Sequence, residues 1–547
     1  MKKYTGKRVY EGIAIGKIIK YDESININDT IGKGYNIELE RFNNAREKAK
    51  ENYEVIYNKS KKELLNNNSD IILSYISLLD DLDLIENVDY FLKNENISAE
   101  KAVDKTCHLL KEMLSNIENE YLKERVNDIQ EVCTKIINYL LNKKNQIINY
   151  ECIVVSNNLS VSTLLQIDKT KLLGLVLENV SPNSHIAILA RSLGIPCIAS
   201  LNESLVIEDN SEVILDCSNG VLITSPSNEE IEKYKEIQAQ FIKNKQELSI
   251  YKNIEIKTID NKKLKVYANI SSSFEIDSVK ENGADGIGLF RSEYIYINND
   301  TFPSEDQQFN HYVKCVQEMQ DKPTIIRTMD IGADKQVEYF NLTKENNPFL
   351  GYRGVRLYKQ YKDVFITQLL ALLRASNYGN LKIMIPMITN IEEVKYILTC
   401  LEEAKETLIL RKEQFNKNMK IGVMIETPAA ALICDEIAKH VDFFSIGTND
   451  LSQYILAIDR ENSNVLDVFN PSHKAILRLI YHISKVAKEN NIEVGICGEL
   501  ARNKELQGFF ILCGIDEISV SSSYVLECKK NIAEIDTRKL NLKDYIN

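Results

Sequence analysis

The 547-residue sequence has no Cys-x-x-Cys pair, no long apolar run and no excess of basic residues. Its eleven cysteines are scattered through a chain too large to need disulfides for folding, which favours a reduced cytoplasmic protein without structural zinc. No stretch approaches the roughly 18 apolar residues of a membrane span, and the basic start lacks the apolar region of a signal peptide. The net charge of −12 argues against a broad nucleic-acid surface. We therefore expect a soluble cytoplasmic protein with neither membrane insertion nor a nucleic-acid partner.

The sequence pattern changes along the first half of the chain. Residues 1–25 form a short extended segment, whereas apolar residues recur at helical spacing within residues 26–144. Over residues 145–227, short apolar runs bounded by turns alternate with helical stretches, which indicates an α/β unit. We expect the first segment to join the sheet of this unit, so that the helical domain is an insertion, and residues 228–258 to form a linker helix.

The remaining residues, 259–547, contain eight short apolar runs separated by helical stretches. The runs are 265–270, 286–290, 324–328, 383–387, 421–425, 443–446, 493–496 and 517–520. Eight alternations of strand and helix over this length predict a C-terminal (β/α)₈ barrel, so the fold class is α/β. Because the chemistry of such barrels takes place at the C-terminal ends of the strands, the residues after each run are the site candidates.

Charged side chains gather at these positions. Converging guanidinium groups suit a small, multiply charged anion, because each can bind a phosphate or carboxylate through two N–H groups. The candidate arginines are Arg291, Arg327, Arg353 and Arg460. Two acids, Glu426 and Asp450, offer the hard oxygens that Mg²⁺ takes together with substrate oxygens. The structural alternative for the acids is helix capping at the barrel loops, and the arginines favour the metal.

Cys497 follows the seventh run, between Gly495 and Gly498. A cysteine in a strand is most often a small buried hydrophobic residue. The glycines allow the backbone to approach a ligand closely, which favours a proton-transfer role for the thiol.

His185 is the candidate nucleophile. Pro182, Asn183 and Ser184 predict a turn and an N-cap, which places His185 in the first turn of a helix. The positive end of that helix disfavours imidazolium, and its backbone amides would stabilise a phosphoryl dianion. The alternative is a structural histidine, which is the role we assign to the other five.

Long motifs extend over nearly the whole chain. They are YLKER at 121–125, SHIAILARSLGIP at 184–196, GIGLFRSEYIY at 286–296, RTMDIGADK at 327–335, NPFLGYRGVR at 347–356, GVMIETPAAA at 422–431, DFFSIGTNDLSQY at 442–454, DR at 459–460 and GICGELA at 495–501. On these motifs the chain resembles Enzyme I of the bacterial sugar phosphotransferase system, the phosphoenolpyruvate-protein phosphotransferase family.

The resemblance implies a two-step relay that serves sugar uptake. Phosphoenolpyruvate binds with Mg²⁺ in the barrel, its phosphoryl group passes to His185, and the histidine carrier HPr takes it from there. Phosphoenolpyruvate would be held by Arg291, Arg327, Asn449, Asp450 and Arg460. Glu426 and Asp450 would ligate Mg²⁺, and Cys497 would protonate the enolate carbon. The resemblance also implies that residues 1–25 and 145–227 form the phosphohistidine domain, that HPr docks on the inserted helical domain, and that the barrel domain forms a homodimer.

The loop before the histidine departs from the family pattern. Relatives carry Gly-Gly-Arg-Thr-Ser-His there, whereas this chain has Val180-Ser181-Pro182-Asn183-Ser184-His185. The two glycines, which most readily let a backbone approach a phosphoryl group, are absent.

Two other functions stay open at this point. A phosphoenolpyruvate-sensing regulator, or a paralogue with an impaired relay, would bind in the barrel without passing the phosphoryl group on, and the altered loop is its support. An enzyme of the pyruvate phosphate dikinase type shares the histidine and barrel domains, but it needs a nucleotide-binding domain for which this chain has no room.

Overall fold

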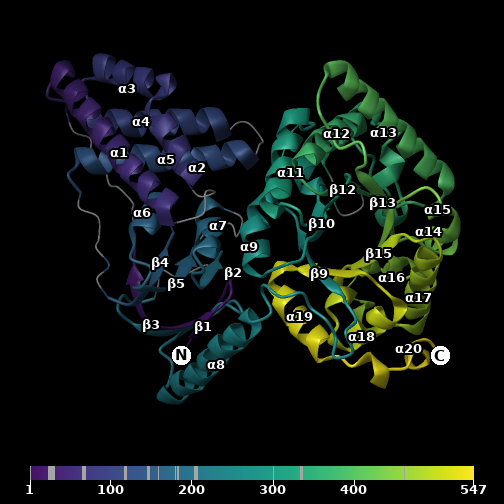
Figure 1. Cartoon of the computed structure of the whole chain (residues 1–547). Helices are drawn as coiled ribbons and strands as arrows, with labels where there is room; N and C mark the ends of the chain where they lie inside the picture. The colour runs from purple at the N-terminus through teal and green to yellow at the C-terminus, as the bar shows by residue number, and fades with distance from the viewer. Residues whose placement is uncertain are drawn as a thin grey trace. The chain divides into compact units, whose positions relative to one another are not determined.

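The computed structural model describes the chain as two units, Met1–Asn244 and Lys245–Asn547, which are treated separately below (Figure 1). It describes all residues except 1, 23–26, 28–30, 64–68, 116–119, 144–147, 149, 158, 179, 181–183, 202–206, 298, 300, 333–334, 336, 461 and 463. None of the helices in the described part of the chain is long and apolar enough to cross a lipid bilayer.

The first unit is built on an eight-stranded sheet with the order β1-β8-β7-β3-β4-β5-β6-β2. Its strands are β1 (Lys2–Thr5), β2 (Lys7–Tyr10), β3 (Ile13–Lys20), β4 (Cys152–Ser156), β5 (Leu172–Leu177), β6 (Cys197–Ala199), β7 (Glu212–Asp216) and β8 (Val221–Thr224). Strand β3 pairs in parallel with β4 and antiparallel with β7. The N-terminal strands therefore share one sheet with strands that follow more than 100 residues later.

Among the described residues, five helices lie between β3 and β4 in the sequence, and three more come after β4 and before the barrel strands. They are α1 (Tyr35–Glu63), α2 (Ser69–Leu79), α3 (Leu82–Glu95), α4 (Ala99–Ser115), α5 (Glu120–Leu140), α6 (Val161–Gln166), α7 (His185–Ser192) and α8 (Asn228–Ser249). The carboxylate of Glu38 in α1 is buried, and it accepts hydrogen bonds from Ala99 N at 2.9 Å and Lys33 N at 3.0 Å. A buried acid thus accepts a hydrogen bond from the first amide of α4, which has no partner within the helix, and it fixes that helix against α1.

Consecutive residues of β4 point to opposite faces of the sheet. Cys152 and Val154 pack in one core together with α1 to α5, whereas Ile153 and Val155 pack in a second core on the other face. Since both faces are covered, β4 is a continuous apolar run rather than an alternating one.

The second unit contains a closed barrel of eight strands in the order β9 to β16, all paired in parallel. The strands are β9 (Lys265–Ile270), β10 (Ile287–Arg291), β11 (Thr324–Arg327), β12 (Leu381–Ile385), β13 (Lys420–Ile425), β14 (Phe443–Gly447), β15 (Glu493–Cys497) and β16 (Glu517–Ser521). This confirms the predicted (β/α)₈ barrel, with each strand within two residues of its predicted run. The largest shift is at β12, which ends before Pro386 because proline has no N–H for the strand ladder and Met387 has a φ of 60°.

Helices surround the barrel. They are α9 (Ile276–Glu281), α10 (Glu293–Ile297), α11 (Glu305–Met319), α12 (Lys362–Ala375), α13 (Ile391–Arg411), α14 (Pro428–Leu432), α15 (Cys434–Ile437), α16 (Thr448–Leu456), α17 (Lys474–Glu489), α18 (Lys504–Cys513), α19 (Val525–Glu534) and α20 (Leu542–Ile546). One large apolar core joins these helices to the outer face of the strands, and a smaller one forms from Leu289, Ile325, Met384, Met424, Phe443 and Cys497.

Candidate active site at the C-terminal end of the barrel

Several candidate residues follow or close neighbouring strands. Arg291 closes β10 and Arg327 closes β11, and the parallel register pairs these two residues directly. Glu426 follows β13, Asp450 lies in the first turn of α16 after β14, and Cys497 closes β15. Because the barrel strands are parallel, these side chains belong to the same end of the barrel.

Arg327 lies between two buried carboxylates. Its Nη2 is 2.5 Å from Glu293 Oε1, and its Nη1 is 3.2 Å from Asp330 Oδ2. Lys335 Nζ contacts the same two oxygens at 2.7 Å and 3.3 Å. Burial opposes the charge on Arg327, but the carboxylates of Glu293 and Asp330 outweigh burial and raise its pKa. Burial also opposes the charge on Asp330, and Lys335, Arg353 and Arg327 nevertheless hold its pKa well below the ordinary value. Arg327 and Asp330 therefore both favour their charged forms despite their burial.

Arg353 connects this cluster to Asp450. Its Nη2 lies 2.8 Å from Asp330 Oδ2, and its Nη1 lies 3.4 Å from Asp450 Oδ1. Arg460 Nη2 is 3.9 Å from the same Asp450 oxygen. The site thus brings Arg327, Arg353 and Arg460 together through shared acids.

Glu426 is buried, and its Oε1 accepts a hydrogen bond from Met387 N at 2.7 Å. The positive φ of Met387 is rare for a residue other than glycine, and such backbone strain tends to occur at functional sites. Burial raises the pKa of Glu426 to about 8, the negative charge of Asp450 adds to this effect, and Arg327 opposes it. Two acids therefore repel each other in a buried position, where a divalent cation would stabilise both.

The donor set at Glu426 and Asp450 fits Mg²⁺ rather than a metal held by protein alone. In the described part of the chain, no three His, Cys, Asp or Glu side chains group together to hold a metal ion. Mg²⁺ commonly takes one or two carboxylates and completes its shell with substrate oxygens and water.

Buried polar atoms at the site also lack protein partners. Among the described residues, Arg327 Nε and Arg460 Nη1 have no hydrogen-bond acceptor. Buried N–H groups are nearly always paired in folded proteins, so two unpaired guanidinium donors in one cluster indicate room for an anionic ligand.

Cys497 is 2% exposed and belongs to the smaller apolar core of the barrel. Ser445 Oγ donates to its sulfur at 3.5 Å, and the thiol contacts the carbonyl of Ile446 at 3.6 Å. Burial raises the pKa of the Cys497 thiol to about 12. The thiol therefore keeps its proton at neutral pH and can act as a proton donor.

Asn449 links α16 to the turn after β15. Its Oδ1 accepts a hydrogen bond from Glu499 N at 2.9 Å. Gly498 has a φ of +95°, and a Cβ atom there would lie 2.4 Å from Thr448 Oγ1 and 2.7 Å from Asn449 Oδ1. Only glycine allows this close packing of the two loops.

His185 belongs to the other unit, where it is the first residue of α7. Ser184 is the N-cap, and its Oγ accepts a hydrogen bond from Ala187 N at 3.4 Å, in agreement with the predicted helix start. The loop departs from the family pattern at residues 180–183. Val180 is described, and its carbonyl accepts a hydrogen bond from Ser200 Oγ at 2.9 Å, whereas residues 181–183 lie outside the described residues.

Comparison with known proteins identifies the family. The chain matches the families described as "PEP-utilising enzyme, N-terminal" at residues 5–125, "PEP-utilising enzyme, mobile domain" at 148–220 and "PEP-utilising enzyme, PEP-binding domain" at 245–537. It is 35% identical to the phosphoenolpyruvate-protein phosphotransferase of Priestia megaterium over 539 residues, which cover 98% of this chain and 94% of the relative. The protein of the same name from Bacillus subtilis (strain 168) is 35% identical over 549 residues, with coverages of 98% and 95%. The chain belongs to the phosphoenolpyruvate-protein phosphotransferase family.

Family membership confirms the resemblance found in the motifs, and it identifies the chain as a phosphotransferase enzyme. The match to the PEP-binding family covers the whole barrel sheet, in which the charged cluster lies.

Glu293 and Lys335 belong to the charged cluster around Arg327, and sequence reasoning missed both. Glu293 is fully buried and contacts both Arg327 and Lys335. Both missed residues lie inside motifs that carry the family resemblance, GIGLFRSEYIY and RTMDIGADK. A charged residue within a long matching motif was the available signal.

Proposed function

We propose that this chain transfers the phosphoryl group of phosphoenolpyruvate to its own His185 and then to the histidine carrier HPr, releasing pyruvate, as part of sugar uptake. The observation that carries the proposal is the cluster of arginines in which Arg327 Nε and Arg460 Nη1 lack an acceptor among the described residues, at the barrel end where a substrate of such folds binds. Phosphoryl transfer depends mainly on positioning and on stabilising charge, and such a cluster supplies both.

Phosphoenolpyruvate would be held by the arginines and by the first turn of α16. The residues are Arg291, Arg327, Arg353, Asn449, Asp450 and Arg460. The arginines offer forked donors for its phosphate and carboxylate oxygens. Their contacts with Asp330 and Asp450 hold the guanidinium groups in place before the substrate arrives.

Glu426 and Asp450 would hold Mg²⁺, which when bound offsets negative charge on the substrate oxygens. Cys497 would protonate the methylene carbon after the phosphoryl group leaves. In that step the S–H bond breaks, a C–H bond forms, and the enolate becomes pyruvate. The imidazole of His185 would attack phosphorus, and its place at the start of α7 suits a phosphorylated product because helix N-termini favour anions.

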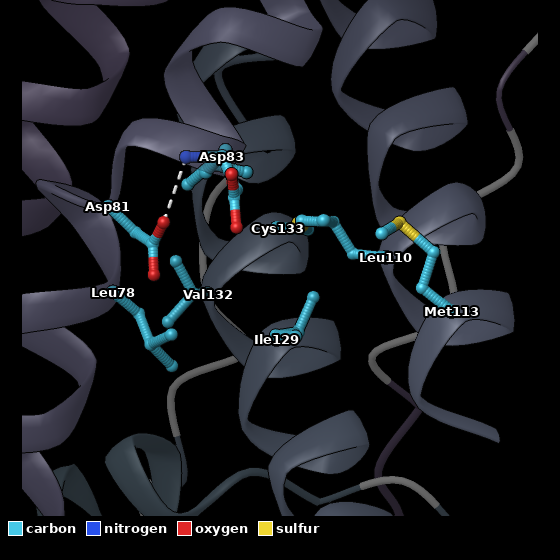
Figure 2. Close-up of a pocket in the computed structure, with 9 residues that line it drawn as sticks. Leu78, Asp81, Asp83, Leu110, Met113, Ile129, Val132 and Cys133 are labelled. Carbon is cyan, nitrogen blue, oxygen red and sulfur yellow. Dashed lines mark hydrogen bonds between the residues drawn. The ribbon is translucent and has the colours of Figure 1, made fainter. Parts of the chain in front are cut away.

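HPr would dock on the helical domain, residues 26–144. This region contains a cavity of about 230 Å³, lined by Leu78, Asp81, Asp83, Leu84, Leu110, Met113, Ile129, Val132 and Cys133 (Figure 2). Next to it Leu82 is 70% exposed, and in its wall Met113 is 60% exposed. Exposed apolar side chains beside two carboxylates suit a partner surface that combines apolar and basic groups.

The domain boundaries belong to the same proposal. Residues 1–25 and 145–227 would form the phosphohistidine domain, 228–258 the linker helix, and 259–547 the phosphoenolpyruvate-binding domain that also forms a homodimer. Exposed apolar residues on the barrel helices, such as Leu410 at 84% and Leu432 at 69%, support an interface there. All eleven cysteines are free and buried, which supports a reducing cytoplasmic location.

The test is phosphoryl transfer from radiolabelled phosphoenolpyruvate, with and without Mg²⁺ and HPr. We expect one acid-labile phosphoryl group on the wild type, chased by HPr, and none on His185→Ala. His482→Ala, which removes an exposed histidine of α17, is the matched control and should label normally. Labelling of His185→Ala would place the nucleophile elsewhere, and label that HPr cannot remove would refute the relay.

A further inference from the structure

Gln368 is a polar residue on the buried face of α12. Its side chain is fully buried, and buried neighbours on the same helix, such as Phe365 and Leu372, are apolar members of the main barrel core. Burying an amide costs free energy unless hydrogen bonds replace those that it makes with water. The amide of Gln368 therefore needs hydrogen-bond partners inside the barrel unit.

These partners lie at the ends of two neighbouring strands. Gln368 Oε1 accepts a hydrogen bond from Met329 N at 2.9 Å, just after β11. Its Nε2 donates to Ser292 Oγ at 2.9 Å, just after β10, and to Tyr312 Oη at 3.0 Å. One side chain thus joins the segment after β10 to the segment after β11 through a fully buried, neutral bridge.

The bridge runs beside a charged contact of the candidate active site. Ser292 precedes Glu293, and Met329 is two residues after Arg327. Arg327 Nη2 and Glu293 Oε1 are 2.5 Å apart. The two strand ends are therefore joined twice, once by this ion pair and once by the amide of Gln368.

The peptide groups of Met329 depend on side chains for their hydrogen bonds. Met329 is fully buried and lies beyond the end of β11. Gln368 accepts from its N–H, and Tyr358 Oη donates to its carbonyl at 2.8 Å. Since buried peptide groups are nearly always paired, loss of the Gln368 amide would leave an N–H without an acceptor and favour a shift of this segment.

We propose that Gln368 is a positioning residue for phosphoryl transfer, which fixes the separation of the β10 and β11 ends and thereby holds Arg327 and Glu293 in their working geometry. This inference rests on the proposed function of the charged cluster. A substrate phosphate attracts the Arg327 guanidinium and competes with Glu293 for it, whereas the neutral bridge does not respond to that charge. Groups that stabilise developing charge act best when they are held in place before the reaction.

The first test compares Gln368→Met with the wild-type full chain. Methionine has a similar length but neither accepts nor donates the hydrogen bonds of the bridge. We expect kcat for pyruvate formation, per phosphoenolpyruvate site counted by calorimetry, to fall by roughly ten- to a hundredfold, because small displacements of charged groups have effects of this size. KM should rise by less than about threefold, since the other arginines still bind the substrate.

The matched control is Gln507→Met. Gln507 is another fully buried glutamine of the same unit, in α18, and its amide bonds to neither strand end among the described residues. Its kcat per site and its KM should equal those of the wild type, whatever the change in Tm. A role of Gln368 in stability alone would likewise alter Tm and leave kcat per site unchanged.

Ser292→Ala removes one end of the bridge and little volume, so it keeps the test valid if Gln368→Met does not fold. It should lower kcat severalfold with nearly unchanged KM, and its loss should not add to that of Gln368→Met in the double variant, because both changes break the same bridge. Wild-type kcat per site in either single variant, or additive losses in the double variant, would overturn the proposal.

Hydrogen exchange of the Met329 amide tests the bridge without reference to activity. This amide should exchange slowly in the wild type and in Gln507→Met, and at least about tenfold faster in Gln368→Met. Equal exchange in the wild type and Gln368→Met would overturn the proposal. A wild-type protein that shows the expected exchange but forms no pyruvate from phosphoenolpyruvate would confirm the bridge and refute the proposed function.

Discussion

The guanidinium of Arg353 contacts both carboxylate oxygens of Asp330, with Nη2 2.8 Å from Oδ2 and Nε 3.3 Å from Oδ1. The same guanidinium reaches Asp450 Oδ1 at 3.4 Å through Nη1. A single planar group therefore fixes an acid next to the end of β11 and another in α16. Lysine has the same charge, but all of its donor groups are on the single Nζ atom, so it cannot make this set of contacts.

We expect Arg353→Lys to reduce pyruvate formation by roughly ten- to a hundredfold, because hydrogen bonds to charged groups are worth about 1.5–3 kcal/mol each. The matched control is Arg374→Lys, which alters an arginine that bridges the partly buried Glu305 and the exposed Asp306. Steady-state rates of pyruvate release from phosphoenolpyruvate measure both variants. An equal loss in the two variants would show that the fork of Arg353 has no special role.

Glu426→Gln tests the metal-binding proposal with little change in packing. Glutamine keeps an oxygen that can accept the hydrogen bond from Met387 N, but it cannot carry the negative charge. We expect roughly a hundred- to a thousandfold loss of activity, the range for removal of one group that stabilises developing charge, together with loss of the response to added Mg²⁺. Titration of activity with Mg²⁺ checks this.

Glu436→Gln, an exposed acid of α15, is the control for Glu426→Gln and should respond to Mg²⁺ like the wild type. Full Mg²⁺-dependent turnover in Glu426→Gln would show that this carboxylate has only a structural role.

Cys497→Ala tests the proton donor. We expect the variant to bind phosphoenolpyruvate normally but to lose the exchange of pyruvate methyl protons with solvent, because the thiol that holds the proton is gone. Proton exchange followed by NMR, and ligand binding by calorimetry, measure the two properties separately. The control is Cys434→Ala, which removes another buried thiol of the same unit. If exchange persists in Cys497→Ala, the residue returns to the class of buried hydrophobic side chains.

The strands and their order were predictable from the sequence because the barrel strands are buried on both faces. Such strands form continuous apolar runs, as residues 421–425 of β13 do, and the residues that follow them were therefore easy to find. Glu426 and Cys497 are examples of residues found in this way.

Contacts between distant positions were not predictable in the same way. Glu293 follows β10 and meets Lys335 beyond β11, and nothing in local periodicity reveals that a carboxylate at this position is fully buried. Pairing of charges across elements is a property of tertiary packing, which spacing along the chain does not encode.

Glu517 is a buried acid at the start of β16, the end of the barrel opposite to the candidate site. Its Oε2 has no hydrogen-bond partner among the described residues. Burial raises its pKa from the ordinary 4.5 to about 8, Lys382 opposes this, and Asp516 and Glu493 add to it. The folded state therefore binds the proton more tightly than the unfolded state does. It follows that the stability of the fold falls as the pH rises from about 4.5 to about 8.

We accordingly expect Glu517→Gln to stabilise the barrel at alkaline pH, since the amide has nearly the same shape and carries no charge that must be buried. The gain should be on the order of 1–3 kcal/mol at pH 8.5, seen as a rise of roughly 2–8 °C in the Tm of the barrel transition, and it should shrink toward zero near pH 4.5. Thermal unfolding at several pH values measures it, with Glu489→Gln, an exposed acid of α17, as a control whose Tm should follow the wild type throughout. Pyruvate formation should be unaffected, because Glu517 lies at the end of the barrel away from the charged cluster. A Tm difference between Glu517→Gln and the wild type that does not change with pH would mean that the carboxyl group is already ionised in the folded protein, held in that form by Lys382 despite its burial.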